Sequence, residues 1–243
     1  MKIIIAKDYN EMSKIASNII ADVIKENPSS KLGLATGSTP IGTYSELVKK
    51  YNNKEISFKD IKAFNLDEYV GLNAENEQSY KYFMNKNLFD KVDIKPENCF
   101  IPNGVAENLE EEVKRYDNLL ESYGYTDIQI LGIGENGHIA FNEPNKVLHS
   151  ATNIVELKKE TIEANSRFFN DINEVPKLAL SMGLKGIMAS KHILLLASGK
   201  NKALAIKEML SGLISTENPS TLLNLHNNVT VILDKEASEL ILR

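Results

Sequence analysis

The sequence predicts an α/β fold, a three-layer α/β/α open sandwich built on a mostly parallel, Rossmann-like sheet. Short apolar runs alternate with segments of helical periodicity, several of these runs end in a glycine-rich or acidic turn, and no repeat or linker interrupts the alternation. Such an alternation places helices on both faces of a parallel sheet. The expected strands are 2–6, 32–35, 61–65, 128–133, 192–197 and 229–233.

Two of the intervening helices can be predicted together with their ends. The segment 8–26 is apolar at helical spacing, and Asp8 and Glu11 form a capping pair at its start. A proline two residues beyond this segment stops the helix. The segment 106–123 shows the same spacing, and Gly124 ends it.

Composition limits the kind of protein. We expect one domain, 1–243, because no boundary separates two parts. Hydrophobic residues make up 42% of the chain, enough for a sizeable core, and a net charge of −5 argues against nucleic-acid binding. No apolar stretch approaches a membrane span, the apolar N-terminal run is too short for a signal peptide, and a single cysteine suits a reducing compartment. These features predict a cytoplasmic protein with no nucleic-acid or membrane partner.

The most informative stretch, 131–144, is a glycine-rich turn at the end of the predicted strand 128–133. It brings Asn136, His138 and Glu143 close together in the sequence. Ligands of α/β proteins usually bind where strands end in glycine and polar residues. A carboxylate can orient an imidazole, so His138 and Glu143 are a candidate proton-transfer pair. The alternative is a plain turn around a buried histidine whose hydrogen bonds are satisfied.

Three glycines of this stretch, Gly132, Gly134 and Gly137, also spell the dinucleotide-binding pattern. That pattern requires a helix opening at the last glycine and an acid at the end of the next strand. Pro144 would break such a helix, and residues 145–153 contain no strand that ends in an acid. We therefore do not expect a nicotinamide cofactor.

The second stretch follows the predicted strand 32–35 and contains Thr36, Gly37, Ser38 and Thr39. Thr39 is a good N-cap, and the proline after it suits the first position of a helix. A helix N-terminus with free N–H groups and nearby hydroxyls is suited to binding phosphate. An ordinary capped helix start would look the same.

The third stretch ends the predicted strand 61–65 in two adjacent acids, Asp67 and Glu68. Successive strand residues point to opposite sides, so only one of the two would face a given pocket. The alternative is a solvated turn.

Taken together, these stretches resemble the glucosamine-6-phosphate deaminases of the glucosamine/galactosamine-6-phosphate isomerase family, in their short, non-allosteric form. The resemblance runs in order from near residue 1 to about residue 235. Its most specific part is the run from Phe141 to Pro144 after His138. The matching pieces are 36–40, 64–69, 134–144 and 164–169.

The resemblance implies a role for each matching residue. Asp67 would move a proton between C2 and C1 of the open-chain sugar, and His138 would open the pyranose ring with help from Glu143 and Asn136. Some members carry Asp at the position of Asn136, whose amide can orient an imidazole but cannot stabilise imidazolium by charge. The residues expected to bind the 6-phosphate are Thr36, Gly37, Ser38, Thr39, Arg167 and Lys202.

The two cations have simpler alternatives. Arg167 lies in a helix-like stretch and could be a surface residue. Lys202 follows a glycine turn after the predicted strand 192–197, which is a reasonable anion site, but Lys200 is a competing candidate there.

The implied reaction converts glucosamine 6-phosphate and water to fructose 6-phosphate and ammonia. Ring opening, proton transfer and loss of ammonia move no electrons to an acceptor, so we expect no cofactor. We expect no metal site either, because the histidines lack paired ligand spacing and the single Cys99 excludes a thiolate cluster. The histidines are His138, His149, His192 and His226.

Two other functions share this architecture. A phosphosugar lactonase has a similar turn, but the Glu143-Pro144 pair and the acids Asp67 and Glu68 favour the deaminase. A non-catalytic sugar-phosphate-sensing module of a transcription regulator is less favoured, because the chain is acidic and no helix-turn-helix extension is available in it.

Residues 145–175 are polar and look irregular, so they are either a mobile lid or an ordinary surface excursion. The family's effector-binding Arg and Lys positions fall on Asn153 and Val155. Neither side chain can form a charge-assisted bond to a phosphate, so we expect hyperbolic kinetics without allosteric activation. Self-association is left open.

Overall fold

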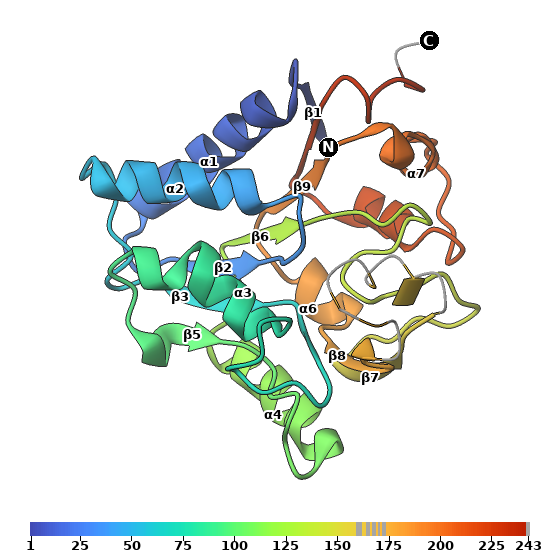
Figure 1. Ribbon diagram of the computed structural model, residues 1–243. Coiled ribbons are helices and arrows are strands. Elements are labelled where there is room, and N and C mark those ends of the chain that lie inside the picture. The colour runs from blue at the N-terminus through green and yellow to red at the C-terminus, as the bar shows by residue number, and fades with distance from the viewer. Residues whose placement is uncertain (159–161, 164–165, 167–168, 170, 172–173, 242–243) are drawn as a thin grey trace.

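The computed structural model describes residues 1–158, 162–163, 166, 169, 171 and 174–241, which form two β-sheets (Figure 1). The larger sheet has the order β1-β10-β9-β6-β2-β3-β5, and all its neighbouring strands are parallel. Its strands are β1 Lys2–Ile5, β2 Lys31–Leu34, β3 Lys62–Asn65, β5 Cys99–Phe100, β6 Ile128–Leu131, β9 Ile193–Ala197 and β10 Val229–Leu233.

All six predicted strands are present, each within two residues of its predicted bounds. Strands β6, β9 and β10 are buried along their whole length, which explains why β9 is a continuous apolar run and why β6 and β10 contain a single polar residue each. The additional strand β5 has only two residues, too few to show a pattern in the sequence.

Helices cover both faces of this sheet, as predicted (Figure 1). The chain moves one way across the sheet from β1 to β5 and then returns, so right-handed crossovers place the early and late helices on opposite faces. None of the helices in the described ranges is long and apolar enough to cross a membrane. The helices are α1 Tyr9–Glu26, α2 Ile41–Asn52, α3 Tyr80–Asn87, α4 Leu109–Ser122, α6 Leu184–Met188 and α7 Ala203–Met209.

The capping residues explain where two of these helices begin. The Asp8 carboxylate accepts the N–H of Glu11 at 2.9 Å, and Glu11 in turn accepts the N–H of Lys7 at 2.6 Å, so the predicted capping pair is confirmed. Helix α4 begins later than the predicted residue 106, because Asn108 accepts the N–H of Glu111 at 3.1 Å and so caps it.

The smaller sheet has the order β4-β8-β7 and is antiparallel. It corrects two expectations. The two acids of the third stretch lie in a buried strand rather than a solvated turn, and the stretch 145–175 is not irregular throughout, because it contains β7. Its strands are β4 Asp67–Tyr69, β7 Asn153–Glu156 and β8 Leu178–Ser181.

Candidate active site

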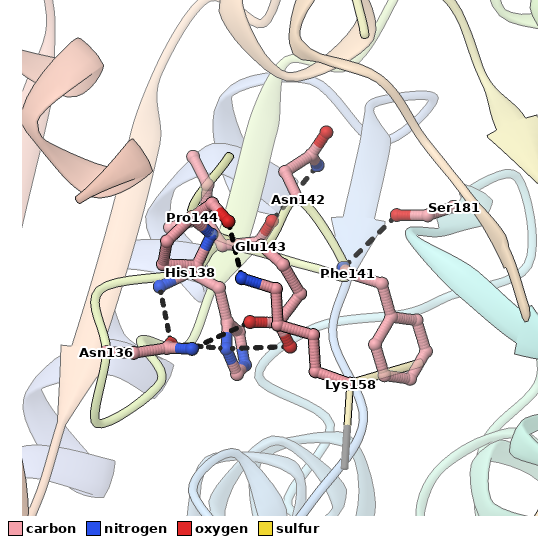
Figure 2. A network of polar contacts seen from close by, with 9 residues as sticks. Asn136, His138, Phe141, Asn142, Glu143, Pro144, Lys158 and Ser181 are labelled. Carbon is pink, nitrogen blue, oxygen red and sulfur yellow. Dashed lines mark hydrogen bonds and ion pairs between the residues drawn. The ribbon is translucent and has the colours of Figure 1, made fainter. Parts of the chain in front are cut away.

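The turn after β6 holds Asn136, His138 and Glu143 in one hydrogen-bonded group. Figure 2 shows the Asn136 side chain in contact with both of the others. Its amide nitrogen donates to Glu143 Oε2 at 2.7 Å, and its amide oxygen lies 2.7 Å from His138 Nδ1. Glu143 Oε1 lies 3.3 Å from the same ring nitrogen. The three residues that lie close together in the sequence therefore also contact one another in the fold, and their roles in proton transfer stay a prediction.

This network fixes the tautomer of His138. An amide oxygen and a carboxylate oxygen both face Nδ1, and both are acceptors, so Nδ1 carries the proton. The neutral ring then keeps its lone pair on Nε2. The side chain of Glu143 is only 6% exposed, whereas that of His138 is 25% exposed. The protein therefore orients His138 through Nδ1, and Nε2 is the ring nitrogen that can exchange a proton.

Glycine is required where the backbone of the turn passes the imidazole. A Cβ on Gly134 would lie 2.3 Å from atoms of the His138 ring. The N–H of Gly134 also donates to the His138 carbonyl at 2.9 Å, which closes the turn. No helix begins at Gly137, so this turn lacks the helix that the dinucleotide-binding pattern requires.

Asp67 is a buried carboxylate that lacks hydrogen-bond donors among the described residues. It is 6% exposed, and no hydrogen bond to its carboxylate is found in the part of the chain that the structure describes. Burial raises its pKa to about 8, and the neighbouring charge of Glu68 contributes to the shift. A carboxylate in this environment binds a proton much more strongly than one in water.

The tyrosine hydroxyls near Asp67 donate their hydrogen bonds to backbone carbonyls. Tyr44 donates to the Ala35 carbonyl at 2.5 Å, and Tyr116 donates to the Asn65 carbonyl at 2.5 Å. These donors thus do not stabilise the Asp67 carboxylate. Burial, together with the nearby charge of Asp67, raises the pKa of three tyrosines, Tyr44, Tyr80 and Tyr116.

Glu68 is buried too, but its carboxylate is bonded to the backbone. It accepts the N–H groups of Tyr69 at 2.8 Å and of Tyr80 and Lys81 at 2.9 Å. Burial raises its pKa to about 7, although these bonds act in the opposite direction. Glu68 therefore holds the start of α3, and Asp67 is left as the acid available to a ligand.

Two residues that sequence reasoning missed bring the three stretches together. Asp67 pairs with Ser181 across β4 and β8, and the Ser181 hydroxyl accepts the N–H of Phe141 at 3.1 Å. Tyr80 stacks on Phe141 with ring centroids 6.2 Å apart, and its hydroxyl lies beside the side chain of Thr36. Neither residue carried a signal, since serine in a strand and tyrosine at a helix start are ordinary.

The loop expected to bind phosphate is built differently from the prediction. Helix α2 has Pro40 in the cap position and no side-chain cap, so the assignment of Thr39 as N-cap is wrong. A residue of α1 takes over part of this work, because the Tyr9 hydroxyl accepts the N–H of Gly42 at 2.8 Å and donates to the Ser38 carbonyl at 3.1 Å. The hydroxyls of the loop are therefore not needed as caps.

The turn after β9 contains the two competing lysines. Gly199 has a φ of +94°, and its N–H donates to the buried Asp234 carboxylate at 3.1 Å, which fixes the turn. Lys200 is highly exposed and forms an ion pair with Glu239 at 3.3 Å. Lys202 is partly buried and directly precedes α7, and its role as a phosphate ligand stays a prediction.

Arg167 lies outside the described residues, and its predicted contact with phosphate stays a prediction. Among the described residues no cluster of His, Cys, Asp or Glu has the geometry of a metal site.

Comparison with known proteins identifies the family. The family model described as glucosamine-6-phosphate isomerases/6-phosphogluconolactonase matches residues 9–232. A glucosamine-6-phosphate deaminase of Clostridium perfringens (strain SM101 / Type A) is 51% identical over 99% of this chain and all of the relative. Glucosamine-6-phosphate deaminase 1 of Bacillus subtilis (strain 168) is 50% identical over 99% of both chains.

Solved structures agree with this result. The structure of a monomeric glucosamine-6-phosphate deaminase has a TM-score of 0.97 and 50% identity, over 99% of this chain and 100% of the other. A 6-phosphogluconolactonase from Trypanosoma cruzi has a TM-score of 0.78 over 98% and 96% of the two chains, but at 22% identity it shows the fold alone. The chain belongs to the glucosamine-6-phosphate isomerase/6-phosphogluconolactonase family.

Proposed function

We propose that this chain converts glucosamine 6-phosphate and water to fructose 6-phosphate and ammonia. The observation that carries the proposal is the presence of two unlike acid–base groups: His138, which is oriented through Nδ1 and keeps its lone pair on Nε2, and a buried Asp67 of raised pKa. Hydrogen bonds and strand pairing connect them through Ser181 and Phe141. The full-length relatives that are about 50% identical carry the name of this activity.

His138 opens the sugar ring. Its Nε2 accepts the proton of the anomeric hydroxyl and a proton returns to the ring oxygen as the C1–O5 bond breaks, which leaves an aldehyde at C1. The positive charge that forms on the imidazole meanwhile is stabilised by Glu143, which lies 3.3 Å from Nδ1. Asn136 keeps both groups aligned. The charge that an aspartate would supply at position 136 is thus supplied by Glu143.

Asp67 then transfers a proton between two carbons. The C1 aldehyde acidifies C2, so the Asp67 carboxylate removes the C2 proton and leaves an enolamine. Returning that proton to C1 gives an imine at C2, to which water adds as ammonia leaves, and the product is the ketose. No step transfers electrons to an acceptor, so the reaction requires no redox cofactor.

Binding at the 6-phosphate completes the proposal. We assign it to Thr36, Gly37, Ser38 and Thr39, together with Arg167 and Lys202. The loop hydroxyls lie beside the N-terminal end of α2 and Lys202 lies at that of α7, where helix dipoles favour an anion. These residues belong to one chain, so a single subunit would suffice for the reaction. Because a phosphorylated sugar does not cross membranes unaided, we place this activity in the cytoplasm.

One assay separates this function from its alternatives. The pure protein, with no added cofactor or metal, should release ammonia from glucosamine 6-phosphate and form fructose 6-phosphate in equal amount. A 6-phosphogluconolactone is the matched control substrate, because lactonases share the fold. Hydrolysis of the lactone without ammonia release from the amino sugar would refute the proposal, and binding of the sugar phosphate without turnover would indicate a sensing module.

A further inference from the structure

A second segment holds the turn before His138 from behind. Gly137 has a φ of +84°, and a Cβ placed on it would lie 2.1 Å from Oδ1 of Asn218. The flat amide of Asn218 therefore lies directly against the Gly137 backbone. The N–H of Ser220 also donates to the Gly137 carbonyl at 2.9 Å. The peptide that leads into His138 is thus held by contact on one side and by a hydrogen bond on its carbonyl.

The Asn218 amide can adopt only one orientation. Its nitrogen donates to the Ala205 carbonyl at 3.3 Å and to Glu208 Oε2 at 3.1 Å, and its oxygen accepts the Ser220 hydroxyl at 2.5 Å. Flipping the amide would place an oxygen against two acceptors. Asn218 is only 4% exposed, so water cannot replace these bonds easily.

These contacts connect two parts of the proposed site. Ala205 and Glu208 belong to α7, whose first turn follows Lys202. The same segment reaches the far end of the turn, since the N–H of Asn145 donates to the Thr216 carbonyl at 3.3 Å. Residues 215–221, which we call the brace, thus contact the catalytic turn at Gly137, between Asn136 and His138, and at Asn145, beyond Glu143, and they tie this turn to α7.

We propose that Asn218 is a positioning residue that holds the His138 imidazole at the ring oxygen of the substrate. The proposal rests on the role in ring opening proposed above for His138. Displacing a reacting group by about 1 Å can cost roughly 10²-fold in rate, so a residue that sets the Gly137 peptide acts on the rate of ring opening. The hydrogen bonds of its side chain go to Ala205, Glu208 and Ser220, so its loss should leave the proton transfer at Asp67 unchanged.

The test separates ring opening from binding of the open chain. Asn218→Ala should lower kcat on glucosamine 6-phosphate by about 10- to 100-fold, because the Gly137 peptide loses its support. The reduced amino alditol 6-phosphate has no ring to open, so its inhibition constant should stay within about twofold of the parent value. A parallel weakening of both would show a general disruption of the site and overturn the proposal.

Asn224 provides the matched control. It lies in the 3-10 helix Pro219–Leu225, which begins directly after Asn218, and its amide donates to the carbonyls of Met209 at 2.8 Å and Thr221 at 2.9 Å. Asn224→Ala thus removes two comparable bonds, one of them to the end of α7, without reaching Gly137, and kcat should stay within about twofold. An equal loss of kcat in the two variants would mean that the brace contributes stability only.

Two further variants keep the result decisive. If Asn218→Ala does not fold, Ser220→Ala removes the hydroxyl that orients the Asn218 amide but keeps the backbone bond to Gly137. It should lower kcat several-fold with an unchanged inhibition constant, and a parental kcat would overturn the proposal. His138→Gln tests the role of His138 itself. If this variant keeps the full kcat, the proposed role of His138 in ring opening is wrong. If His138→Gln loses activity and Asn218→Ala does not, only the proposed role of Asn218 is wrong.

Discussion

The two acid–base regions of this site are constructed in opposite ways. The Asp67 carboxylate is buried, and the tyrosine hydroxyls near it donate to backbone carbonyls rather than to the carboxylate. Around His138 the protein supplies partners, since Asn136 and Glu143 both contact the ring nitrogen Nδ1. One group is made basic by isolation, and the other is oriented by hydrogen bonds.

The difference corresponds to the two proton transfers. Removing a proton from carbon requires a strong base, and desolvation makes a carboxylate more basic at the cost of protein stability. Moving a proton between two oxygens requires an accurately placed acid–base group, and hydrogen bonds supply that placement. Adjacent Glu68 illustrates the contrast, because three backbone N–H groups occupy its carboxylate.

The largest effect should follow the loss of the isolated base. Asp67→Asn keeps the shape of the side chain but cannot accept a proton from carbon, so turnover should fall by at least about 10⁴-fold, the upper range for a general base. The measurement is kcat for ammonia release, with Glu68→Gln as the neighbouring control. Activity that survives in Asp67→Asn and disappears in Glu68→Gln would reverse the roles we assign to the two acids.

A smaller loss should follow the removal of the oriented group. His138→Gln should lower kcat on the pyranose by about 10²–10³-fold, less than Asp67→Asn, because a fraction of the sugar opens in water without help. Supplying the substrate already in the open chain should restore part of the rate to His138→Gln and none to Asp67→Asn. Equal losses in both variants on both substrate forms would contradict a division of labour.

The isolation of Asp67 also predicts opposite pH effects on stability and activity. Its pKa is about 8 in the folded chain against an ordinary value of 3.8, so the folded state retains a proton that the unfolded state has lost. The stability from this residue is complete below about pH 4 and declines as the pH rises to about 8. Over the same range kcat/KM should rise, because only the ionised carboxylate can accept a proton.

The measurement is the melting temperature of Asp67→Asn relative to the parent at several pH values. The variant cannot titrate, so its advantage should grow between about pH 4 and pH 8 and then level off, and each 1 kcal/mol should appear as roughly 2–4 °C. The exposed Asp22 provides the control, since Asp22→Asn should show no such trend. A constant difference across this range would mean that Asp67 is ionised in the folded protein.

The main sheet could be predicted from the sequence because the signals for its strands and helices lie within each segment. Buried parallel strands such as β9 and β10 are almost entirely apolar, and capping residues such as Asp8 mark the helix that follows β1. The smaller sheet gave no such signal. Its strand β4 contains two acids in three residues, and it forms only because β8, far away in the chain, pairs with it.

The residues of the candidate site likewise fall into those that the sequence indicates and those that only the fold reveals. Asn136, His138 and Glu143 lie in one turn, so their contact follows from the sequence alone. Ser181 and Asn218 contact that turn from distant segments, and their residue types occur in many ordinary settings. The sequence can name the groups that could do chemistry, but the residues that hold them depend on tertiary contacts.

The smallest expected effect concerns regulation. Asn153, at one of the family's effector positions, uses its amide to bond the Ala151 carbonyl at 3.2 Å, and Val155, at the other, packs in the apolar cluster around Tyr69. Neither offers a charge to a phosphate. Saturation with glucosamine 6-phosphate should therefore be hyperbolic, and N-acetylglucosamine 6-phosphate should not activate. Nearby Lys146 offers a check: sigmoidal curves that Lys146→Ala makes insensitive to the effector would reveal a different anion site.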